Sequence, residues 1–301
     1  MGKHIVIKQA HAGTQEMHDR EVTTHMELQG HPHYLEVLDT IERDEGLPLI
    51  VMPWCKKGSL SKYGNKNREM TGMPYTSIIV LVRQLMQAAK GLEHMHSLNV
   101  VHCDLKEDSI LVELDESVKV ADFGLSVEEG TRIKGIHGSL PYIAPEILDA
   151  YLEAAKSGQP FSYEARPWHD VWGMGVMAFA ALSPKPMHWL RLLDLEDLED
   201  LLDLEDFLDL SPEDQTNMLQ HEARRYHLDL LGLGVHRVGL EVDPSDWVML
   251  TLLRILQGCL RENPEERTTA TELQAQLQTL LWCAEAAGQV RASLPLSPVL
   301  V

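Results

Sequence analysis

The segment VVHCDLKEDSILV, residues 100–112, places charged side chains between apolar flanks. Asp104 and Lys106 stand two residues apart in its polar centre, and two short predicted strands, SILVEL and SVKVAD, surround the acidic turn that follows. A carboxylate on a loop held by flanking strands can orient or accept the proton of a hydroxyl group. A loop-capping aspartate is the structural alternative. The segment therefore predicts a loop that presents a carboxylate beside an ammonium group.

Two further motifs follow this loop at defined spacings. ADFGL carries Asp122, 18 residues after Asp104, and YIAPE carries Glu146, 24 residues after Asp122. The loop reads as the pattern H-R-D-L-K-x-x-N, and the three motifs in this order resemble those of eukaryotic-type serine/threonine protein kinases. Three spaced motifs in the expected strand-to-loop context make the resemblance specific.

Four more residues extend the resemblance to about residues 4–282. Lys8 ends the strand-like IVIK, and Glu21 lies in the helix-like REVTTHMELQGHPH. Asp170 lies in HDVWGMGV, where it is expected to brace the catalytic loop. Arg267 lies in RENPEERTTATEL and is expected to pair with the glutamate of YIAPE. We interpret Glu146, Asp170 and Arg267 as scaffold residues.

The resemblance implies an α+β, two-lobed protein kinase-like fold. Residues 1–54 would form a truncated first lobe with a small antiparallel sheet and one helix, and residues 55–283 a mainly helical second lobe. An acidic insertion is expected at about 192–214, and the small, polar residues 284–301 are expected to form a flexible tail.

Residue patterns along the chain fit this order of elements. Strands are predicted in KHIVIKQA and LPLIVMPWC, with a helix in HDREVTTHMELQG between them. Residues 56–74 are predicted to form a polar loop with at most one short helical turn, and Thr76–His96 a helix. Further helices are predicted in PEILDAYLEAAKSG, HDVWGMGVMAFAAL, the acidic leucine-rich stretch, DWVMLTLLRILQGCLREN and TATELQAQLQTLLW, the last capped by Thr269 or Thr271.

The resemblance gives three residues a catalytic role. Asp104 would orient or accept the proton of the substrate hydroxyl, and Lys106 would place a cation beside the moving phosphoryl group. Ser139 in GSLPY would bond this pair and shape the acceptor pocket. Lysine at position 106, where tyrosine kinases usually carry alanine, favours serine or threonine acceptors.

The resemblance also implies ATP and a divalent metal, Mg2+ or Mn2+, as cofactors. Asp122 would bind the metal that bridges the outer phosphates, with Phe123 packed inward. Lys8, held by Glu21, would bind the inner phosphates. Ser109 replaces the usual asparagine of the loop; its hydroxyl could ligate the metal but is shorter and has no amide carbonyl.

The adenine site is expected where the second predicted strand ends. Pro53, Trp54 and Cys55 resemble the hinge whose backbone bonds the adenine edge, although proline removes one donor. Met52 would lie behind the base and Leu111 beneath it.

Other departures concern the phosphate loop and regulation. No glycine-rich segment precedes Lys8, so we expect either a shortened form of a longer kinase or a fold that binds nucleotide weakly without that lid. Cys103 replaces an arginine that meets a loop phosphate in the family, so activation is not expected to use that contact. Ser126 and Thr131 are candidate phosphorylation sites, with unused surface hydroxyls as the favoured interpretation. The sequence gives no account of His25, which stands where an apolar residue is usual.

The chain carries 46 acidic and 26 basic side chains, a formal charge of -20. This balance argues against a nucleic acid or an anionic membrane as the main partner and favours basic protein substrates. Four spaced cysteines without a CxxC pair predict a reducing, cytoplasmic compartment, and scattered histidines predict no structural metal. The first apolar run is too short for a signal peptide, and IIVLV is too short for a membrane span. Nothing in the sequence indicates an oligomeric state.

Two segments read as insertions. Residues 148–168 look longer than the family requires, and residues 194–209 hold nine carboxylates and no basic side chain. The favoured interpretation of the acidic stretch is a solvated helix whose leucines pack inward. The alternative is a docking surface for basic substrates or partners.

Three functions remain open from the sequence. The leading one is a kinase that transfers the γ-phosphate of ATP to serine or threonine hydroxyls of proteins. The second is a weak or inactive pseudokinase that acts as a binding or scaffold module, which the missing lid and Ser109 favour. The third is a small-molecule kinase of the aminoglycoside or choline type, which would normally lack the ADFG and YIAPE combination.

Overall fold

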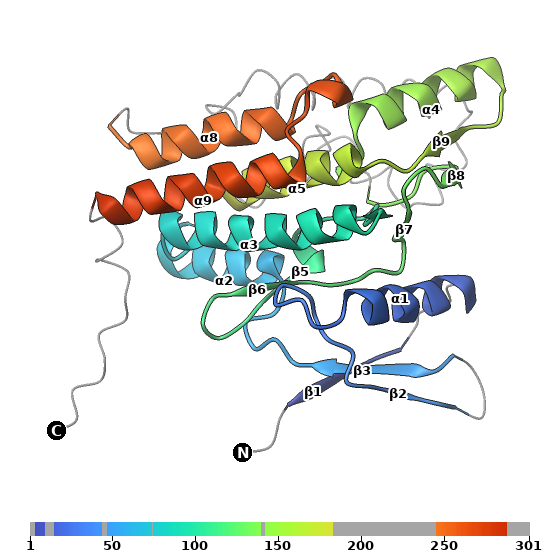
Figure 1. Ribbon diagram of the computed structural model, residues 1–301, viewed down its shortest axis with the longest axis horizontal. Helices are drawn as coiled ribbons and strands as arrows, with labels where there is room; N and C mark the ends of the chain where they lie inside the picture. The colour runs from blue at the N-terminus through green and yellow to red at the C-terminus, as the bar shows by residue number, and fades with distance from the viewer. Residues whose placement is uncertain are drawn as a thin grey trace.

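The computed structural model sets a small sheet and one helix against a larger group of helices (Figure 1). It describes residues 4–9, 15–43, 47–73, 75–139, 142–182 and 245–287, and the predicted acidic insertion lies outside them. In chain order the elements are β1 (Ile5–Lys8), α1 (Gln15–Leu28), β2 (Asp39–Ile41), β3 (Leu49–Pro53), α2 (Leu60–Thr71), α3 (Ile78–Ser97), β4 (Val100–Val101), the 3-10 turn η1 (Glu107–Ser109), β5 (Ile110–Val112), β6 (Val118–Val120), β7 (Val127–Glu128), β8 (Arg132–Lys134), α4 (Pro145–Ser157), β9 (Ser162–Glu164), α5 (Pro167–Leu182), α8 (Trp247–Cys259), the 3-10 turn η4 (Pro264–Glu266) and α9 (Ala270–Ala286).

The small sheet is antiparallel, with β3 between β1 and β2. The middle of β3 is buried because both of its edges are paired and apolar side chains cover its faces. In contrast, β1 is an edge strand, and Ile5 and Ile7 are 52% and 51% exposed. The strands predicted in KHIVIKQA and LPLIVMPWC are confirmed as β1 and β3. β2 was not predicted, because three residues, DTI, are too few to show a period of two.

Helix α1 lies between the sheet and the larger group of helices (Figure 1). Its inward face is largely polar, since His18, Glu21, Thr24 and His25 are all buried. Helix-spaced polar residues of this kind carry no hydrophobic signature, so their burial indicates a site rather than ordinary core packing.

Helix α2 corrects the prediction of a loop at residues 56–74. Ser59 caps its first turn by accepting a backbone hydrogen bond, and Gly72 ends it in the left-handed conformation with φ of 80°. Leu60 and Tyr63 are each 5% exposed and pack into the main core. Caps and tertiary packing therefore outweigh the low helix propensity of the glycine, serine and asparagine residues in this segment.

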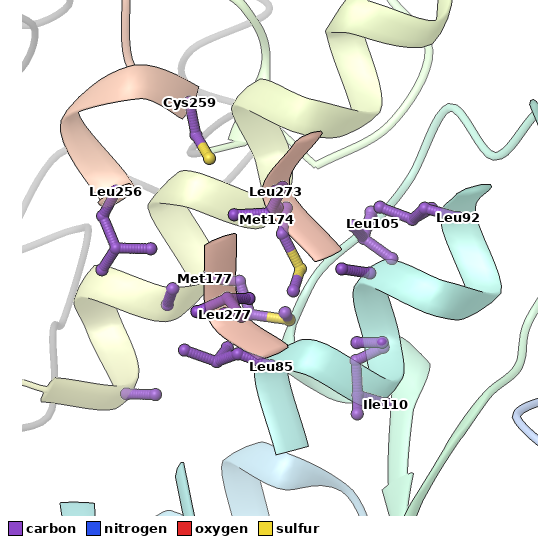
Figure 2. Close-up of a cluster of buried hydrophobic side chains, with 14 of the residues drawn as sticks. Leu85, Leu92, Leu105, Ile110, Met174, Met177, Leu256, Cys259, Leu273 and Leu277 are labelled. Carbon is purple, nitrogen blue, oxygen red and sulfur yellow. The ribbon is translucent and has the colours of Figure 1, made fainter. Parts of the chain in front are cut away.

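The main core lies where α3 packs along α9, with α5 and α8 beside them (Figure 1). The predicted helix at Thr76–His96 is confirmed as α3, which begins at Ser77 as N-cap. Figure 2 shows that the core joins segments distant in the sequence. The side chains that meet there come from α3, the catalytic loop, β5, α5, α8 and α9, and include Leu85, Leu92, Leu105, Ile110, Met174, Met177, Leu256, Cys259, Leu273 and Leu277.

Helix α9 shows both a confirmed and a corrected boundary. Thr269, one of the two predicted caps, forms a capping box with Glu272. The helix continues to Ala286 with Ala284 fully buried, so the ordered chain extends past the predicted tail boundary at residue 283. None of the helices in the described ranges is long and apolar enough to cross a membrane.

Three two-stranded ladders complete the architecture: β5 with β6, β4 with β7, and β8 with β9. The first was predicted, and it flanks the acidic turn after the catalytic loop. The other two were not predicted, because each joins two or three residues from distant parts of the chain.

Candidate active site

The three predicted catalytic residues meet in one group. Lys106 Nζ lies 2.5 Å from Asp104 Oδ2 and 2.8 Å from Ser139 Oγ. The Ser139 backbone N–H donates to Asp104 Oδ1 at 2.8 Å. Both carboxylate oxygens are therefore held from the protein side, and each keeps a further lone pair for a substrate hydroxyl. A loop-capping role alone does not account for the convergence of lysine and serine on this carboxylate.

Asp170 fixes the start of the catalytic loop from α5. Its two carboxylate oxygens accept hydrogen bonds from the backbone N–H groups of His102 and Cys103 at 2.8 and 2.9 Å. Burial acts to raise the pKa of Asp170, but the hydrogen bond and charge of His96 and the His102 contacts outweigh it and hold this pKa below its ordinary value. Cys103 takes a φ of 65°, a left-handed conformation that is strained for a residue other than glycine and that the surrounding contacts must hold.

His102 and Ser109 fix the backbone of Asp104 from two sides. His102 Nδ1 accepts from the Asp104 N–H at 3.3 Å, and its Nε2 lies 3.1 Å from the Ala121 carbonyl oxygen. Because a carbonyl can only accept, these partners assign the proton to Nε2. The buried Ser109 hydroxyl donates to the Asp104 carbonyl at 2.9 Å. The loop is thereby joined to the segment that carries Asp122.

A second group centres on Lys8. Its Nζ lies 2.5 Å from Glu21 Oε1 and 2.7 Å from Asp122 Oδ1. Burial acts to lower the pKa of Lys8, but the charges of Glu21 and Asp122 outweigh it and raise this pKa above its ordinary value. For Asp122, burial acts to raise the pKa and Lys8 lowers it, with a net fall. The Lys8 ammonium group thus joins strand β1 to helix α1 and to the loop at Asp122, which lies 114 positions further along the chain.

His25 links this group to the core. Its Nδ1 lies 3.0 Å from the Leu35 carbonyl oxygen and so carries the proton, while its Nε2 lies 3.9 Å from Glu21 Oε1. The ring meets Phe123 edge to face at 4.7 Å. Burial lowers the pKa of His25 to about 4. A neutral histidine therefore packs as an aromatic core residue behind Glu21, which explains the position that the sequence left without an account.

The predicted adenine residues also converge. Met52 and Cys55 are buried in a small cluster against which Leu111 packs. The Trp54 N–H donates to the His4 carbonyl at 3.1 Å and is not available to a base. Among the described residues no backbone carbonyl accepts the Cys55 N–H.

Among the described residues, the Asp122 carboxylate is the group best placed to bind a magnesium ion. Asp122 keeps 47% of its side chain exposed, and its Oδ2 accepts no hydrogen bond from the described residues. In that part of the chain no three His, Cys, Asp or Glu residues gather as a metal site. Magnesium is commonly bound by one or two carboxylates together with waters and substrate phosphates, so one free carboxylate oxygen suits it.

Arg267 and Glu146 form the predicted ion pair. Arg267 is buried and binds Glu146 through two hydrogen bonds of 2.7 and 2.6 Å. Its guanidinium also lies 5.0 Å from the centre of the Trp172 ring. This pair ties α4 to the segment before α9 and contacts none of the three catalytic candidates.

Sequence reasoning missed or misjudged several residues near the site. His96 supports the catalytic loop through Asp170 but shows no periodic or spacing signal, whereas His102, the first position of the H-R-D-L-K-x-x-N pattern, was given no role from the sequence. Ser126, expected to carry a surface hydroxyl, is 1% exposed and donates to the His102 carbonyl at 3.4 Å, so it is not accessible for phosphorylation. Thr131 is exposed, as expected.

Known proteins resemble this chain over most of its length. A family model described as "Protein kinase domain" matches residues 1–277. The phosphorylase b kinase gamma catalytic chain, liver/testis isoform, of Mus musculus is 30% identical over 174 residues, or 57% of this chain and 40% of that protein. The carbon catabolite-derepressing protein kinase of Secale cereale is 32% identical over 154 residues, or 50% of this chain and 27% of that protein. Serine/threonine-protein kinase GIN4 of Saccharomyces cerevisiae is 34% identical over 167 residues, or 55% of this chain and 13% of that protein. The matched region is thus two fifths or less of each of these relatives.

Proposed function

The chain belongs to the protein kinase domain family, and on this premise we propose that it transfers the γ-phosphate of ATP to serine or threonine hydroxyls of proteins. The nucleotide would lie between the unit of residues 1–54 and the helical unit of residues 55–283. The acceptor hydroxyl would lie beside Asp104.

One observation carries this proposal: Lys106 binds Asp104 and Ser139 together. Phosphoryl transfer depends mainly on positioning and on charge stabilisation. A carboxylate beside an ammonium group supplies both a proton acceptor and a cation for the phosphoryl oxygens. Lysine at position 106, which Ser139 helps to hold, supports a serine or threonine acceptor.

In the proposed step, the substrate hydroxyl oxygen forms a bond to the γ-phosphorus while the bond from that phosphorus to ADP breaks. The hydroxyl proton passes to the Asp104 carboxylate. Lys106 stabilises the charge on the transferred group. Lys8, oriented by Glu21, would hold the inner phosphates in line with the acceptor.

Asp122 would hold a divalent metal, which supplies positive charge to the outer phosphates. We assign Ser109 a second, weaker contact to the metal. Its hydroxyl proton is used by the Asp104 carbonyl, while its oxygen keeps acceptor capacity. The same serine favours the second candidate function, a binding or scaffold module with the kinase fold, because it lacks the amide oxygen of the usual asparagine.

The test is transfer of radiolabelled phosphate from ATP to a generic basic protein, with Mg2+ or Mn2+ in parallel. We expect transfer by the purified chain and its loss in Asp122→Asn, because that change weakens the metal contact without changing the size of the side chain. Phosphoamino-acid analysis should show phosphoserine or phosphothreonine.

The outcomes separate the two functions. Transfer that survives Asp122→Asn would come from a contaminating kinase and would contradict the proposal. A chain that binds nucleotide and transfers nothing with either metal would favour the scaffold function. Phosphotyrosine as the main product would contradict the assigned acceptor class.

A further inference from the structure

Strand β9 comes from residues 148–168, the segment that reads as an insertion, and it pairs with the loop that follows Asp122. In this antiparallel ladder Ile133 of β8 lies opposite Tyr163 of β9. Figure 1 shows that the chain runs from the end of α4 through β9 into the start of α5, with β8 next to β9. The inserted segment therefore pairs directly with the loop that connects Asp122 on the nucleotide side to Ser139 on the acceptor side.

Backbone hydrogen bonds extend the contact beyond the two strands. The Gly130 N–H donates to the Ala165 carbonyl at 2.8 Å, and the Ala165 N–H donates to the Thr131 carbonyl at 2.9 Å. At the other end, the Gly135 N–H donates to the Phe161 carbonyl at 3.2 Å. The loop is thus held along six consecutive residues, 130–135.

Charged side chains match across the ladder. Arg132 lies directly opposite Glu164, an arrangement that stabilises antiparallel pairs. Arg166 then links Glu164 to Glu129 of the loop, with its Nη2 at 2.6 Å from Glu164 Oε2 and its Nη1 at 3.3 Å from Glu129 Oε1. Because these ion pairs are exposed, they help to fix the register of the two strands but contribute little to the free energy of folding.

Tyr163 supplies the apolar part of the contact. It packs with Cys103 against the buried cluster of Val101, Ile133 and Ala165. Tyr163 also lines a small cavity together with His137, two residues before Ser139, and with Asp104 and Ser139 themselves. Tyr163 therefore contacts the catalytic loop and strand β8 and faces the start of the acceptor segment across this cavity.

The ladder also determines where Ser139 lies. Only four residues separate Lys134, the end of β8, from Ser139. In this interval Gly138 takes a φ of 97°, and a Cβ atom there would lie 2.6 Å from the Cys103 carbonyl oxygen. A segment this short and this closely packed keeps Ser139 on Asp104 only while β8 stays in place.

We propose that strand β9, through Tyr163, holds this loop in the arrangement that places Ser139 on Asp104 and Lys106 without any phosphate on the loop. Tyr163 is then a positioning residue. The inserted segment orders the loop, so that phosphorylation of the loop is not needed to order it. The inference rests on the proposed kinase function for its effect on rate, but its effect on loop order stands apart from activity.

The test compares Tyr163→Ala with Tyr75→Ala, a partly buried tyrosine that packs against the main core but not against the cluster of Val101, Ile133 and Ala165. Both are measured in the full chain after phosphatase treatment, with the absence of phosphate checked by mass. Hydrogen–deuterium exchange of residues 130–139 reports on the loop, and the Ser139 amide reports directly on its bond to Asp104. We expect exchange there to be about 10-fold faster in Tyr163→Ala, with phosphate transfer reduced about 10-fold, because a displaced Ser139 misaligns the acceptor.

A reversible tether gives the matched rescue. Arg132→Cys and Glu164→Cys stand directly opposite each other, and opposite Cα atoms in antiparallel strands lie about 4.5–5.5 Å apart, within the range of a disulfide. Placed on Tyr163→Ala in a Cys283→Ser background, the oxidised tether should restore slow exchange at Ser139 and the transfer rate. Reduction should remove both effects.

Each other outcome decides a part of the proposal. Equal exchange of residues 130–139 in Tyr163→Ala and Tyr75→Ala would overturn it. So would wild-type activity that disappears on phosphatase treatment. A wild-type chain with a protected loop and no transfer under any condition would contradict the proposed function while supporting the role of β9 in ordering the loop.

Discussion

Lys106 and Lys8 each bind two carboxylate or hydroxyl partners in this site, but the segments that carry them differ in how firmly they are packed. Lys106 belongs to a loop that Asp170 anchors to α5, and the neighbouring Leu105 enters the main core (Figure 2). Lys8 ends an edge strand, and Ile5 and Ile7 of that strand are about half exposed. The acceptor side of the site is therefore part of the main core, and the nucleotide side depends on a few polar contacts.

This difference has a consequence for local stability. Regions with few buried apolar contacts open more readily than the core of the same protein. The group around Lys8 should therefore open before the group around Lys106 does. In the complex, phosphate oxygens would add partners for Lys8, so nucleotide should protect β1 more than it protects the catalytic loop.

The largest expected effect is on the acceptor side. Lys106→Met should lower phosphate transfer by about 100- to 1,000-fold, because it removes a cation aimed at the transferred group. Nucleotide affinity and the exchange of β1 amides should stay unchanged, since Lys8 keeps its partners. Lys66→Met, on the exposed face of α2, is the control and should transfer at the wild-type rate. A comparable loss of nucleotide affinity in Lys106→Met would remove the distinction between the two groups.

On the nucleotide side, Lys8→Met should lower transfer by about 100-fold and also weaken nucleotide binding about 10-fold. It leaves Glu21, which is 6% exposed, without its cation, at a cost on the order of 2 kcal/mol in unfolding free energy. Exchange in β1 and β3 should rise while that of α3 stays slow. Adding Glu21→Gln should recover the stability but not the binding. Uniform acceleration across the chain would show that the two regions open as one unit.

Acid should weaken both regions through buried histidines. Burial lowers the pKa of His25 beside the sheet and of His169 in α5 to about 4. The unfolded chain therefore binds more protons between the ordinary histidine pKa of about 6.5 and pH 4. Stability is present above pH 6.5 and is lost as the pH falls through 4, by on the order of 3 kcal/mol for each histidine.

Denaturant titrations at several pH values measure this loss. His25→Leu should reduce the dependence of the unfolding free energy on pH, while His169 continues to contribute. An unchanged pH dependence in His25→Leu would mean that this histidine is not held neutral.

The smallest expected effect concerns the metal. Ser109→Asn restores an amide oxygen beside Asp104 and should raise Mg2+ affinity and transfer by about 3- to 10-fold. Titration of transfer against Mg2+ measures it, with the Ser109→Ala variant as the matched control that should fall below wild type. Equal metal dependence in all three proteins would remove Ser109 from the metal site.

The sequence predicted which site candidates meet better than it predicted the elements around them. Asp104 and Asp122 each lie in a short motif that can be read locally, and the structure brings each of them to its expected lysine. Helix α2 was missed because its support comes from a serine cap and from tertiary packing rather than from an apolar period. Sequence-local propensity cannot register contacts of that kind.

The pairing of β8 with β9 was missed for a different reason. Three-residue strands about 30 positions apart have no period to detect, and their register follows from tertiary placement. His25 was left without an account because its partners, the Leu35 carbonyl and the Phe123 ring, meet it only in the folded chain.

The most direct test of the proposed function measures ATP binding and phosphate transfer on the same sample of Asp104→Asn. Asp104 contacts Lys106 and Ser139 but none of the nucleotide-side residues among the described contacts. We expect wild-type ATP affinity with transfer reduced by about 1,000-fold. Transfer at the wild-type rate would show that this carboxylate is not the catalytic group and would contradict the proposed function.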